Sequence, residues 1–297
     1  MKAKFLMVGI ALLAAVPAHA EVNSQVKAMI DTAMASGNEA DVATIVKIAK
    51  QANPDQAGDI DAIHTAWLAD RAAKKQAELA SAGMLDNWKG QGEAGAYLTT
   101  GNSDNSGVAL GLNLNREGNK WRHAVFAAAD FQKSNGVKTR ERYLVGAKVD
   151  YKISERAYAY GLGQWERDPF LGYSSRLSAS GGVGYRVIDE PDMTLGVEAG
   201  PAWRRTSYVT GVDETKLAGR AALDFGWQIN PGLRFTENAS TYIESGNVST
   251  LSMTALDAKI SGALTARLSY SMQHESDPLP GREKLDTTSR ATLVYGF

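Results

Sequence analysis

The chain has 297 residues, a formal net charge of −1 and no cysteine. Its length accommodates one large domain and a small additional one. The near-neutral charge does not indicate a nucleic-acid-binding surface or a polybasic segment that binds membranes. The absence of cysteine excludes disulfides, thiolate metal sites and cysteine nucleophiles, and it suits a protein that passes through an oxidising compartment.

The N-terminal segment has the three parts of a secretory signal peptide. Two lysines lie in the first four residues, residues 5–16 form an apolar run, and residues 18–20 read Ala-His-Ala, which is the form of a cleavage site. The apolar run is too short to span a bilayer, and no later stretch is long enough for a transmembrane helix. We therefore expect residues 1–20 to be a signal peptide.

Apolar residues recur at helical spacing in residues 21–85. Asn53-Pro54 separates the second apolar stripe from the third, because proline removes a helix donor and restricts the residue before it. The stretch after the third stripe is rich in Ala, Lys, Glu and Gln, which favour helix. The sequence predicts a small helical hairpin or bundle. A plug or a partner-binding module is the alternative.

In residues 86–297 the period of the apolar residues changes to two. Each alternating segment has about a dozen residues, which is the length that a tilted strand needs to cross a bilayer. We count about twelve such segments, although the fifth, ninth and tenth do not show which of their faces is apolar. The segments start near residues 88, 106, 120, 140, 157, 174, 193, 216, 233, 250, 263 and 285.

The connections between these segments alternate in length. Short turns such as Asn230-Pro231-Gly232 follow the even-numbered segments, and longer polar loops such as residues 206–215 follow the odd-numbered ones. This alternation is typical of outer-membrane β-barrels, in which the short turns are periplasmic. An even number of strands returns the chain to the rim where it entered, so we expect the helical region to lie in the periplasm.

Aromatic residues on the apolar face lie near both ends of the segments. A soluble barrel would place apolar residues inside and polar residues outside, whereas here the charged residues alternate with an apolar band between two aromatic girdles. The sequence therefore predicts an all-β transmembrane barrel. One girdle contains Trp88, Trp121, Tyr151, Tyr185, Trp227 and Tyr295, and the other contains Phe131, Tyr143 and Trp203.

The last segment ends in Leu293-Val294-Tyr295-Gly296-Phe297. Tyr295 and the terminal Phe297 lie on the apolar face of an amphipathic strand. We interpret these two aromatic residues as the signal that the barrel-assembly machinery reads.

Residues 88–297 resemble the salt-induced outer-membrane protein family, which has no established biochemical function. The resemblance implies an outer-membrane location and a link to salt or osmotic stress, and it supplies no catalytic residues. It does not include the helical region. The motifs that carry it are Trp88-Lys89-Gly90 with Gly95, Thr100-Gly101-Asn102-Ser103, Trp165-Glu166-Arg167-Asp168-Pro169-Phe170, residues 181–185, Asp286-Thr287 and residues 294–297.

The charged residues that alternate with the apolar band are the candidate lining of the lumen. A basic lumen favours anions, which predicts a small-solute channel, but internal charges are usually paired, which predicts a filled barrel. Both readings remain open here. The basic candidates are Arg122, Arg142, Lys148, Arg176, Arg186, Arg204, Arg220, Arg267 and Arg290, and the acidic candidates are Glu93, Asp130, Asp150, Glu198 and Asp224.

An outer-membrane hydrolase is the rival class, and the sequence offers it no convincing site. His123 lies on the apolar face without a serine in its segment, and His274 lies at a loop among solvated charges. We therefore expect no catalytic residue, cofactor or metal site. The expected protein is a monomer that contacts outer-membrane lipids and the assembly machinery, does not bind nucleic acid, and admits small solutes if its lumen is open.

Overall fold

A computed structural model of the protein describes residues 22–83, 85–99 and 105–297. The chain forms two compact units that divide between Glu78 and Leu79. The expected signal peptide, residues 1–20, lies outside the described residues. Of the helices in the described part of the chain, none combines the length and the apolar character needed to cross a membrane.

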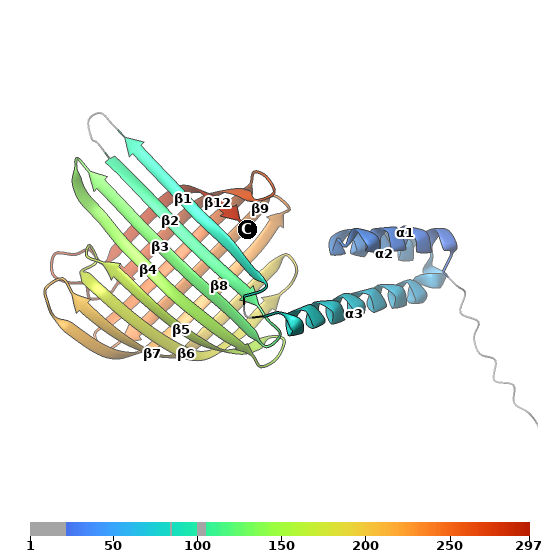
Figure 1. Cartoon of the computed structure of the whole chain (residues 1–297), viewed down its shortest axis with the longest axis horizontal. Helices are drawn as coiled ribbons and strands as arrows, with labels where there is room; N and C mark the ends of the chain where they lie inside the picture. The colour runs from blue at the N-terminus through green and yellow to red at the C-terminus, as the bar shows by residue number, and fades with distance from the viewer. Residues whose placement is uncertain (1–21, 84, 100–104) are drawn as a thin grey trace, which may run out of the picture. The chain divides into compact units, whose positions relative to one another are not determined.

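The first unit contains three α-helices and one short 3-10 helix (Figure 1). Asn23 and Asn38 cap the first two α-helices, because their side chains accept hydrogen bonds from the backbone N–H groups of Gln25 and Ala40. Gly37 ends the first helix with a φ of 72°, a conformation that glycine adopts without a steric cost. The elements are α1 (Ser24–Ser36), α2 (Glu39–Ala52), η1 (Pro54–Gln56) and α3 (Ala57–Ser81).

A small apolar core joins these helices. Ile30, Val42 and Ile60 come from different α-helices and have no exposed surface. Arg71 of α3 donates a hydrogen bond to the carbonyl oxygen of Gly37 at 2.6 Å, which ties α3 to the end of α1. The remainder of α3 has no other fully buried residue, so it contributes little to this core.

The second unit is a closed barrel of twelve antiparallel strands (Figure 1). Each strand pairs with its sequence neighbours, and β1 closes the barrel by pairing with β12. The strands are β1 (Trp88–Thr99), β2 (Asn105–Glu117), β3 (Trp121–Ser134), β4 (Val137–Lys152), β5 (Ala157–Asp168), β6 (Tyr173–Asp189), β7 (Met193–Tyr208), β8 (Asp213–Asn230), β9 (Leu233–Glu244), β10 (Asn247–Lys259), β11 (Leu264–Glu275) and β12 (Leu285–Gly296).

The expected fold class, a barrel of about twelve antiparallel strands after a small helical region, is confirmed. No strand begins more than three residues from its expected start. The sequence signal is strong because the alternation of apolar and polar residues must match the pleat of every strand. The connections after β3 and β9 have only two residues, because β4 and β10 begin earlier than expected, so the expected alternation of loop lengths holds only in part. We call the end of the barrel with the connections after odd-numbered strands the long-loop end, and the opposite end the short-turn end.

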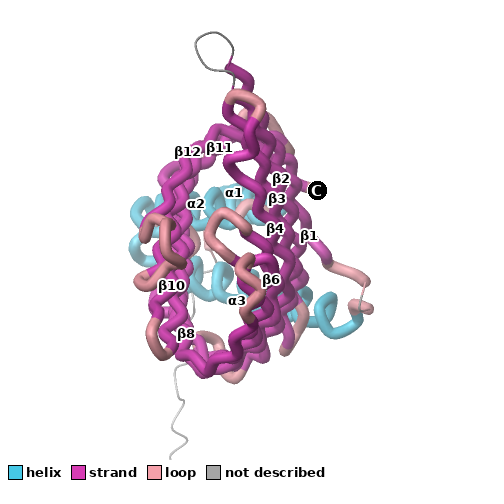
Figure 2. Tube along the Cα trace, turned by 90° about the vertical axis from the view of Figure 1, so that its left-hand side faces the viewer, coloured by secondary structure: helices cyan, strands magenta, loops and turns pink. Residues whose placement is uncertain are grey.

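Side chains alternate between the outer and inner surfaces of the barrel. In β12, Leu293 and Tyr295 are exposed on the outer surface while Thr292 and Val294 are buried. Figure 2 shows the strands as an elongated ring, so that the walls formed by distant strands face each other across the interior. The outer surface therefore carries the exposed apolar residues, as in a barrel that faces lipid.

Strands β9 and β10 depart from this pattern. Tyr242 and Ser249 pair with each other and are buried inside, so the alternation places Glu237 and Thr254, which also pair, on the outer surface. Glu237 accepts hydrogen bonds there from the hydroxyl groups of Ser252 and Thr254. The phase of these strands was ambiguous in the sequence because polar residues interrupt their outer face and apolar residues occur on their inner face.

Candidate functional site

The candidate site is the network of charged and aromatic side chains inside the barrel. Arg176 of β6 donates a hydrogen bond to Glu275 of β11 at 2.9 Å. These strands are not neighbours in the barrel, so this ion pair spans the interior. Only 4% of Arg176 and 5% of Glu275 is exposed, so the pair is shielded from water.

Further side chains surround this pair near the long-loop end. Glu275 also accepts hydrogen bonds from Asn247 and Ser249 of β10. Arg204 of β7 donates a hydrogen bond to Ser249 at 3.1 Å and lies 3.6 Å from Glu244 of β9. We call the residues Tyr173, Arg176, Arg204, Glu244, Ser249 and Glu275 the mouth cluster.

Aromatic rings support the arginines of the mouth cluster. The guanidinium of Arg176 lies 3.9 Å from the centre of the Tyr173 ring, and that of Arg204 lies 4.6 Å from the Tyr242 ring. The hydroxyl group of Tyr173 accepts a hydrogen bond from Gln273 of β11 at 3.3 Å. Cation–π contacts gain strength when they are desolvated, so these rings help to stabilise the positions of the two arginines.

The loop between β5 and β6 is held against the loop between β11 and β12. Asp168 accepts hydrogen bonds from the backbone N–H groups of Phe170 and Leu171 at 3.1 Å, which shapes the first loop. Arg282 of the second loop donates to the carbonyl oxygen of Pro169 at 3.1 Å. These contacts join the two loops at the same end of the barrel as the mouth cluster.

A second group, which we call the central cluster, surrounds Glu198 of β7. This carboxylate accepts hydrogen bonds from Arg220 of β8 at 2.9 Å, from the hydroxyl group of Tyr158 of β5 at 3.0 Å, and from Lys148 of β4. The side chain of Glu198 is only 1% exposed. Asp150 extends the cluster, because it lies 3.5 Å from Lys148 and 3.2 Å from Arg122.

Three more arginines form ion pairs that join strands. Arg267 of β11 contacts Asp257 of β10 through two hydrogen bonds, at 2.7 and 2.8 Å, and Glu93 of β1 at 2.8 Å. Arg290 of β12 lies 2.8 Å from Asp130 of β3. Arg142 of β4 shares Asp130 at 3.9 Å and contacts Glu166 at 3.4 Å. Most of the candidate lumen residues are therefore joined in ion pairs.

Two candidates stand apart from this network. Arg186 contacts only Asp189, which lies three residues further along the same strand, at 3.0 Å. The side chain of Asp224 has no ion pair or hydrogen bond with the described residues, and Asp224 is exposed. Other inward polar residues toward the short-turn end are exposed as well, so solvent enters the barrel from that end. They are Gln91, Asn113, Asn115, Thr194, Arg234 and Asn238.

Several network residues were not among the sequence candidates, including Tyr158, Glu166, Tyr173, Glu244 and Glu275. Three of them lie in β5 or β9, whose phase the apolar pattern left ambiguous, and the other two lie where a strand meets a loop. In β5 the large residues Tyr158, Tyr160 and Leu162 face inward and small residues face outward. Trp165 is exposed on the outer face of β5, and its membership of an aromatic girdle was the signal that could have established this phase.

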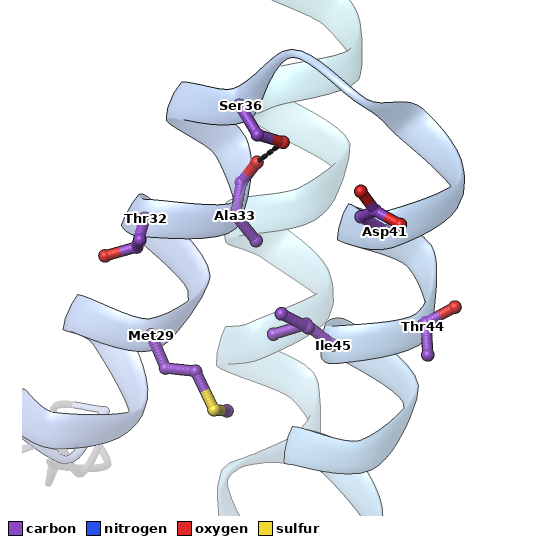
Figure 3. Close-up of a pocket in the computed structure, with 7 residues that line it drawn as sticks. All are labelled: Met29, Thr32, Ala33, Ser36, Asp41, Thr44 and Ile45. Atoms are coloured by element: carbon purple, nitrogen blue, oxygen red, sulfur yellow. Dashed lines mark hydrogen bonds between the residues drawn. The ribbon is translucent and has the colours of Figure 1, made fainter.

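The helical unit has a groove of about 540 Å³ between α1 and α2 (Figure 3). Met29 and Ile45 supply its apolar lining. The hydroxyl groups of Thr32, Ser36 and Thr44 already donate to backbone carbonyl groups of their own helices, at 2.6–2.8 Å. These groups have little left to offer a ligand, and we assign the groove no role.

A comparison with known protein families identifies the family to which the barrel is similar. Residues 92–297 match the family described as "Protein of unknown function, DUF481". The chain belongs to this family. The DUF481 match runs from the fifth residue of β1 to the last residue, so both the mouth cluster and the central cluster lie within it. The helical unit lies outside the DUF481 match.

A curated relative and several solved structures are similar to this DUF481 barrel. The relative is the uncharacterized protein YdiY of Escherichia coli (strain K12), which is 24% identical over 210 residues, 71% of this chain and 82% of YdiY. The NanC porin has a TM-score of 0.45 at 14% identity, covering 70% of this chain and 98% of the porin. An outer membrane channel from Pseudomonas putida F1 has a TM-score of 0.44 at 9% identity, covering 73% of this chain and all of the channel (100%).

Proposed function

We propose that this DUF481 protein is a monomeric outer-membrane barrel whose interior is held closed by buried ion pairs, so that its role is structural rather than that of an open pore. The observation that carries the proposal is the ion pair between Arg176 and Glu275, which joins opposite walls of the barrel. A buried charge is costly unless it is paired and hydrogen-bonded, and here the pairs fill the space that a solute would need. The barrel closes within one chain, which supports the monomer.

The outer-membrane location is supported by the surface of the barrel. Leu217, Val183 and Leu268 are among the large apolar residues exposed on its outside, where water contact would be unfavourable. Aromatic pairs lie toward both ends of the barrel, with ring centres 4.9 Å apart for Trp121 and Tyr151 and 5.3 Å apart for Phe131 and Tyr143. Such rings are enriched at the two membrane interfaces. The link to salt or osmotic stress is supported by the family resemblance alone.

The absence of a catalytic role is part of this proposal. The alternation of side chains places His123 and His274 on the outer surface of the barrel, away from the network. The nearest aromatic contact of His123 is the Trp88 ring, whose centre is 6.5 Å away. A histidine beside a girdle tryptophan is typical of an interfacial position rather than of a nucleophilic site.

A small-solute channel with a basic, anion-preferring lumen is the second candidate. It is favoured by a cavity of about 610 Å³ that remains between β12 and the strands β1–β4. It is also favoured by the exposed polar residues toward the short-turn end. In this case the ion pairs line a pathway instead of closing it.

Conductance across a planar lipid bilayer separates the two candidates. We expect the wild-type barrel to conduct barely at all, and we expect Arg176→Glu to destabilise it by about 3–5 kcal/mol, because that change leaves buried like charges beside Glu275. Arg205→Glu is the matched control: Arg205 forms an exposed pair with Asp213, so the expected cost is only about 0–1 kcal/mol.

Steady, anion-selective conductance by the wild type would contradict the closed barrel. The double variant Arg176→Glu and Arg220→Glu should then shift the reversal potential toward cations while the barrel stays folded. A conducting wild type whose selectivity does not respond to this double change would exclude the basic-lumen channel as well.

A further inference from the structure

The cavity of about 610 Å³ is bounded by the long-loop halves of β1, β2, β3 and β12 and by the start of β4. Its volume lies within the range of about 300–1,000 Å³ that is usual for small-molecule sites. Arg140, Arg290, Gln132 and Thr288 are among the polar residues that line it. It lies beside the ion pairs described above, and neither the structural role nor the channel assigns it a ligand.

Arg140 lacks the ion pair that most arginines inside this barrel form. The inward arginines 122, 142, 176, 204, 220, 267 and 290 each have a carboxylate within 4.0 Å. Among the described residues, Arg140 has none at that distance, and its Nη1 donates only to the hydroxyl group of Thr288, at 3.0 Å. Its Nε is buried without a hydrogen-bond partner.

None of the carboxylates near the cavity is in direct contact with Arg140 among the described residues. Asp130 is already bound by Arg290 at 2.8 Å and is shared with Arg142 at 3.9 Å. Asp286 lines the cavity at the exposed start of β12. Two arginines and two aspartates line the cavity, and Asp168 interacts electrostatically with Arg140 from beyond 4.0 Å. The guanidinium of Arg140 is thus partly shielded from water without a carboxylate in direct contact, so an anion bound there would supply the hydrogen bonds that this group lacks.

A β-bulge lies directly beside Arg140 in the pairing of β3 with β4. The register between β3 and β4 shifts between Gln132 and Lys133, so that Gln132 pairs with Arg140 and Lys133 pairs with Lys138. This bulge leaves Thr139 unpaired and reverses the alternation beyond it. β-Bulges at the rim of a barrel commonly redirect a side chain toward a site.

We propose that this cavity binds a small organic acid, with the carboxylate of the ligand on the guanidinium of Arg140 and its hydroxyl groups on Thr288 and Gln132. A guanidinium matches a carboxylate because its N–H groups form a planar fork that can donate two parallel hydrogen bonds. The site lies in the long-loop half of the barrel and does not depend on ion conduction. It therefore stands independently of whether the barrel is closed or is a channel.

Glucuronate and glucose make a suitable pair of probes, because glucuronate has a carboxylate where glucose has a hydroxymethyl group. Binding to the purified, folded full-length chain is measured by isothermal titration calorimetry. We expect glucuronate to bind and glucose to bind at least about tenfold more weakly, since the hydrogen bonds to a charged group are lost. Equal binding of both sugars, or no binding of glucuronate at millimolar concentration, would overturn the proposal.

The Arg140→Gln variant tests the residue itself. It should weaken glucuronate binding by about tenfold or more while leaving the weak binding of glucose unchanged. The control is Arg205→Gln, which removes an exposed arginine of β7 that does not line the cavity and should bind like the wild type. Unchanged glucuronate binding by Arg140→Gln would exclude the site.

Folding of each variant is followed by its heat-modifiable migration in gel electrophoresis. If Arg140→Gln does not fold, Arg140→Lys decides the question, because it retains the charge but not the planar fork. We expect Arg140→Lys to bind glucuronate more weakly than the wild type. Wild-type affinity in this variant would show that the proposed two-bond recognition is wrong.

Discussion

At the scale of single residues, the interior is organised around carboxylates that serve several partners. Glu198 receives hydrogen bonds from Lys148, Tyr158 and Arg220 although its side chain is almost completely buried. Its position at the meeting point of β4, β5, β7 and β8 means that one carboxylate connects a third of the barrel wall. Loss of its charge should therefore affect stability more than loss of any exposed pair.

We expect Glu198→Gln to lower the free energy of unfolding by about 3–5 kcal/mol, because Lys148 and Arg220 keep their charges inside the barrel without their shared partner. The matched control is Asp189→Asn, which breaks the half-exposed pair with Arg186 at the short-turn end and should cost about 0–1 kcal/mol. Denaturant unfolding in detergent or lipid measures both. Similar values for the two variants would show that Glu198 is solvated rather than buried.

For strands whose apolar alternation is unambiguous, the sequence predicted which face a charged residue occupies. It did not predict which residue that side chain contacts. Arg220 and Asp224 share one face of β8, yet Arg220 binds Glu198 of β7 and Asp224 binds none of the described residues. The partner of Arg176 comes from β11, and that contact depends on how far the ring is flattened. Alternation along a strand contains no information about contacts across the interior.

At the scale of the strands, the apolar pattern predicted every strand start within three residues, but it failed to give the phase of β5, β9 and β10. The reason is physical. Inward aromatic residues in β5 and the outward Glu237 with its bound hydroxyl groups in β9 and β10 remove the usual contrast between the two faces. Where both faces are mixed, register follows from the neighbouring strands and not from the strand itself.

Strands β6 and β7 approach each other closely at two glycines. A Cβ atom on Gly200 would lie 2.2 Å from the carbonyl oxygen of Gly181, and one on Gly182 would lie 2.2 Å from that of Ala199. These neighbours are backbone atoms, which cannot move aside without disturbing the sheet. In the sequence, Gly181-Gly182 of β6 and Gly200-Pro201 of β7 indicate this place.

We expect Gly200→Ala to destabilise the barrel by about 1–3 kcal/mol, because the added methyl group overpacks a backbone contact. Gly219→Ala in β8 is the matched control, since a Cβ atom there would meet nothing within 4 Å. The two variants are compared by thermal unfolding under identical conditions. A Gly200→Ala barrel as stable as the Gly219→Ala barrel would show that the two strands separate at no cost.

The last strand closes the barrel through a short seam. Among the described residues, four residue pairs join β1 and β12, from Gln91↔Gly296 to Ala94↔Leu293. Beyond them the backbones of Gly90 and Phe297 exchange hydrogen bonds at 2.8 and 2.9 Å, and the Phe297 ring occupies the space above Gly90. The terminal residue is thus both an outward aromatic group and a part of the seam.

We expect deletion of Phe297 to lower the amount of folded barrel in the outer membrane more than Phe297→Ala does, because the deletion removes the seam hydrogen bonds as well as the ring. Quantification of the heat-modifiable form in membrane fractions measures this amount. An assembly role of the aromatic ring requires Phe297→Ala to fall below the wild type too. An unchanged amount in both variants would make the terminal residue dispensable.

At the scale of the whole molecule, the even number of strands determines which ends share a compartment. The start of β1 and the end of β12 lie side by side, as the hydrogen bonds between Gly90 and Phe297 show. The turns between even and odd strands, such as residues 190–192, lie at the same end. This part of the fold could be predicted from the sequence because counting strands needs only the period and the turn residues. The role of the helical unit could not, since it lies outside the family match.

We expect the helical unit, residues 22–78, to be periplasmic, because short turns face the periplasm in outer-membrane barrels. Protease added to intact cells should leave this unit uncut, and it should be cut once the outer membrane is permeabilised. A peptide tag inserted at Asn135-Gly136, in the connection between β3 and β4, should be accessible to antibody on intact cells. The same tag inserted in residues 190–192 is the matched control and should become accessible only after permeabilisation. Cleavage of the helical unit on intact cells, or surface exposure of the control tag, would reverse the orientation and place the arginine cavity on the periplasmic side.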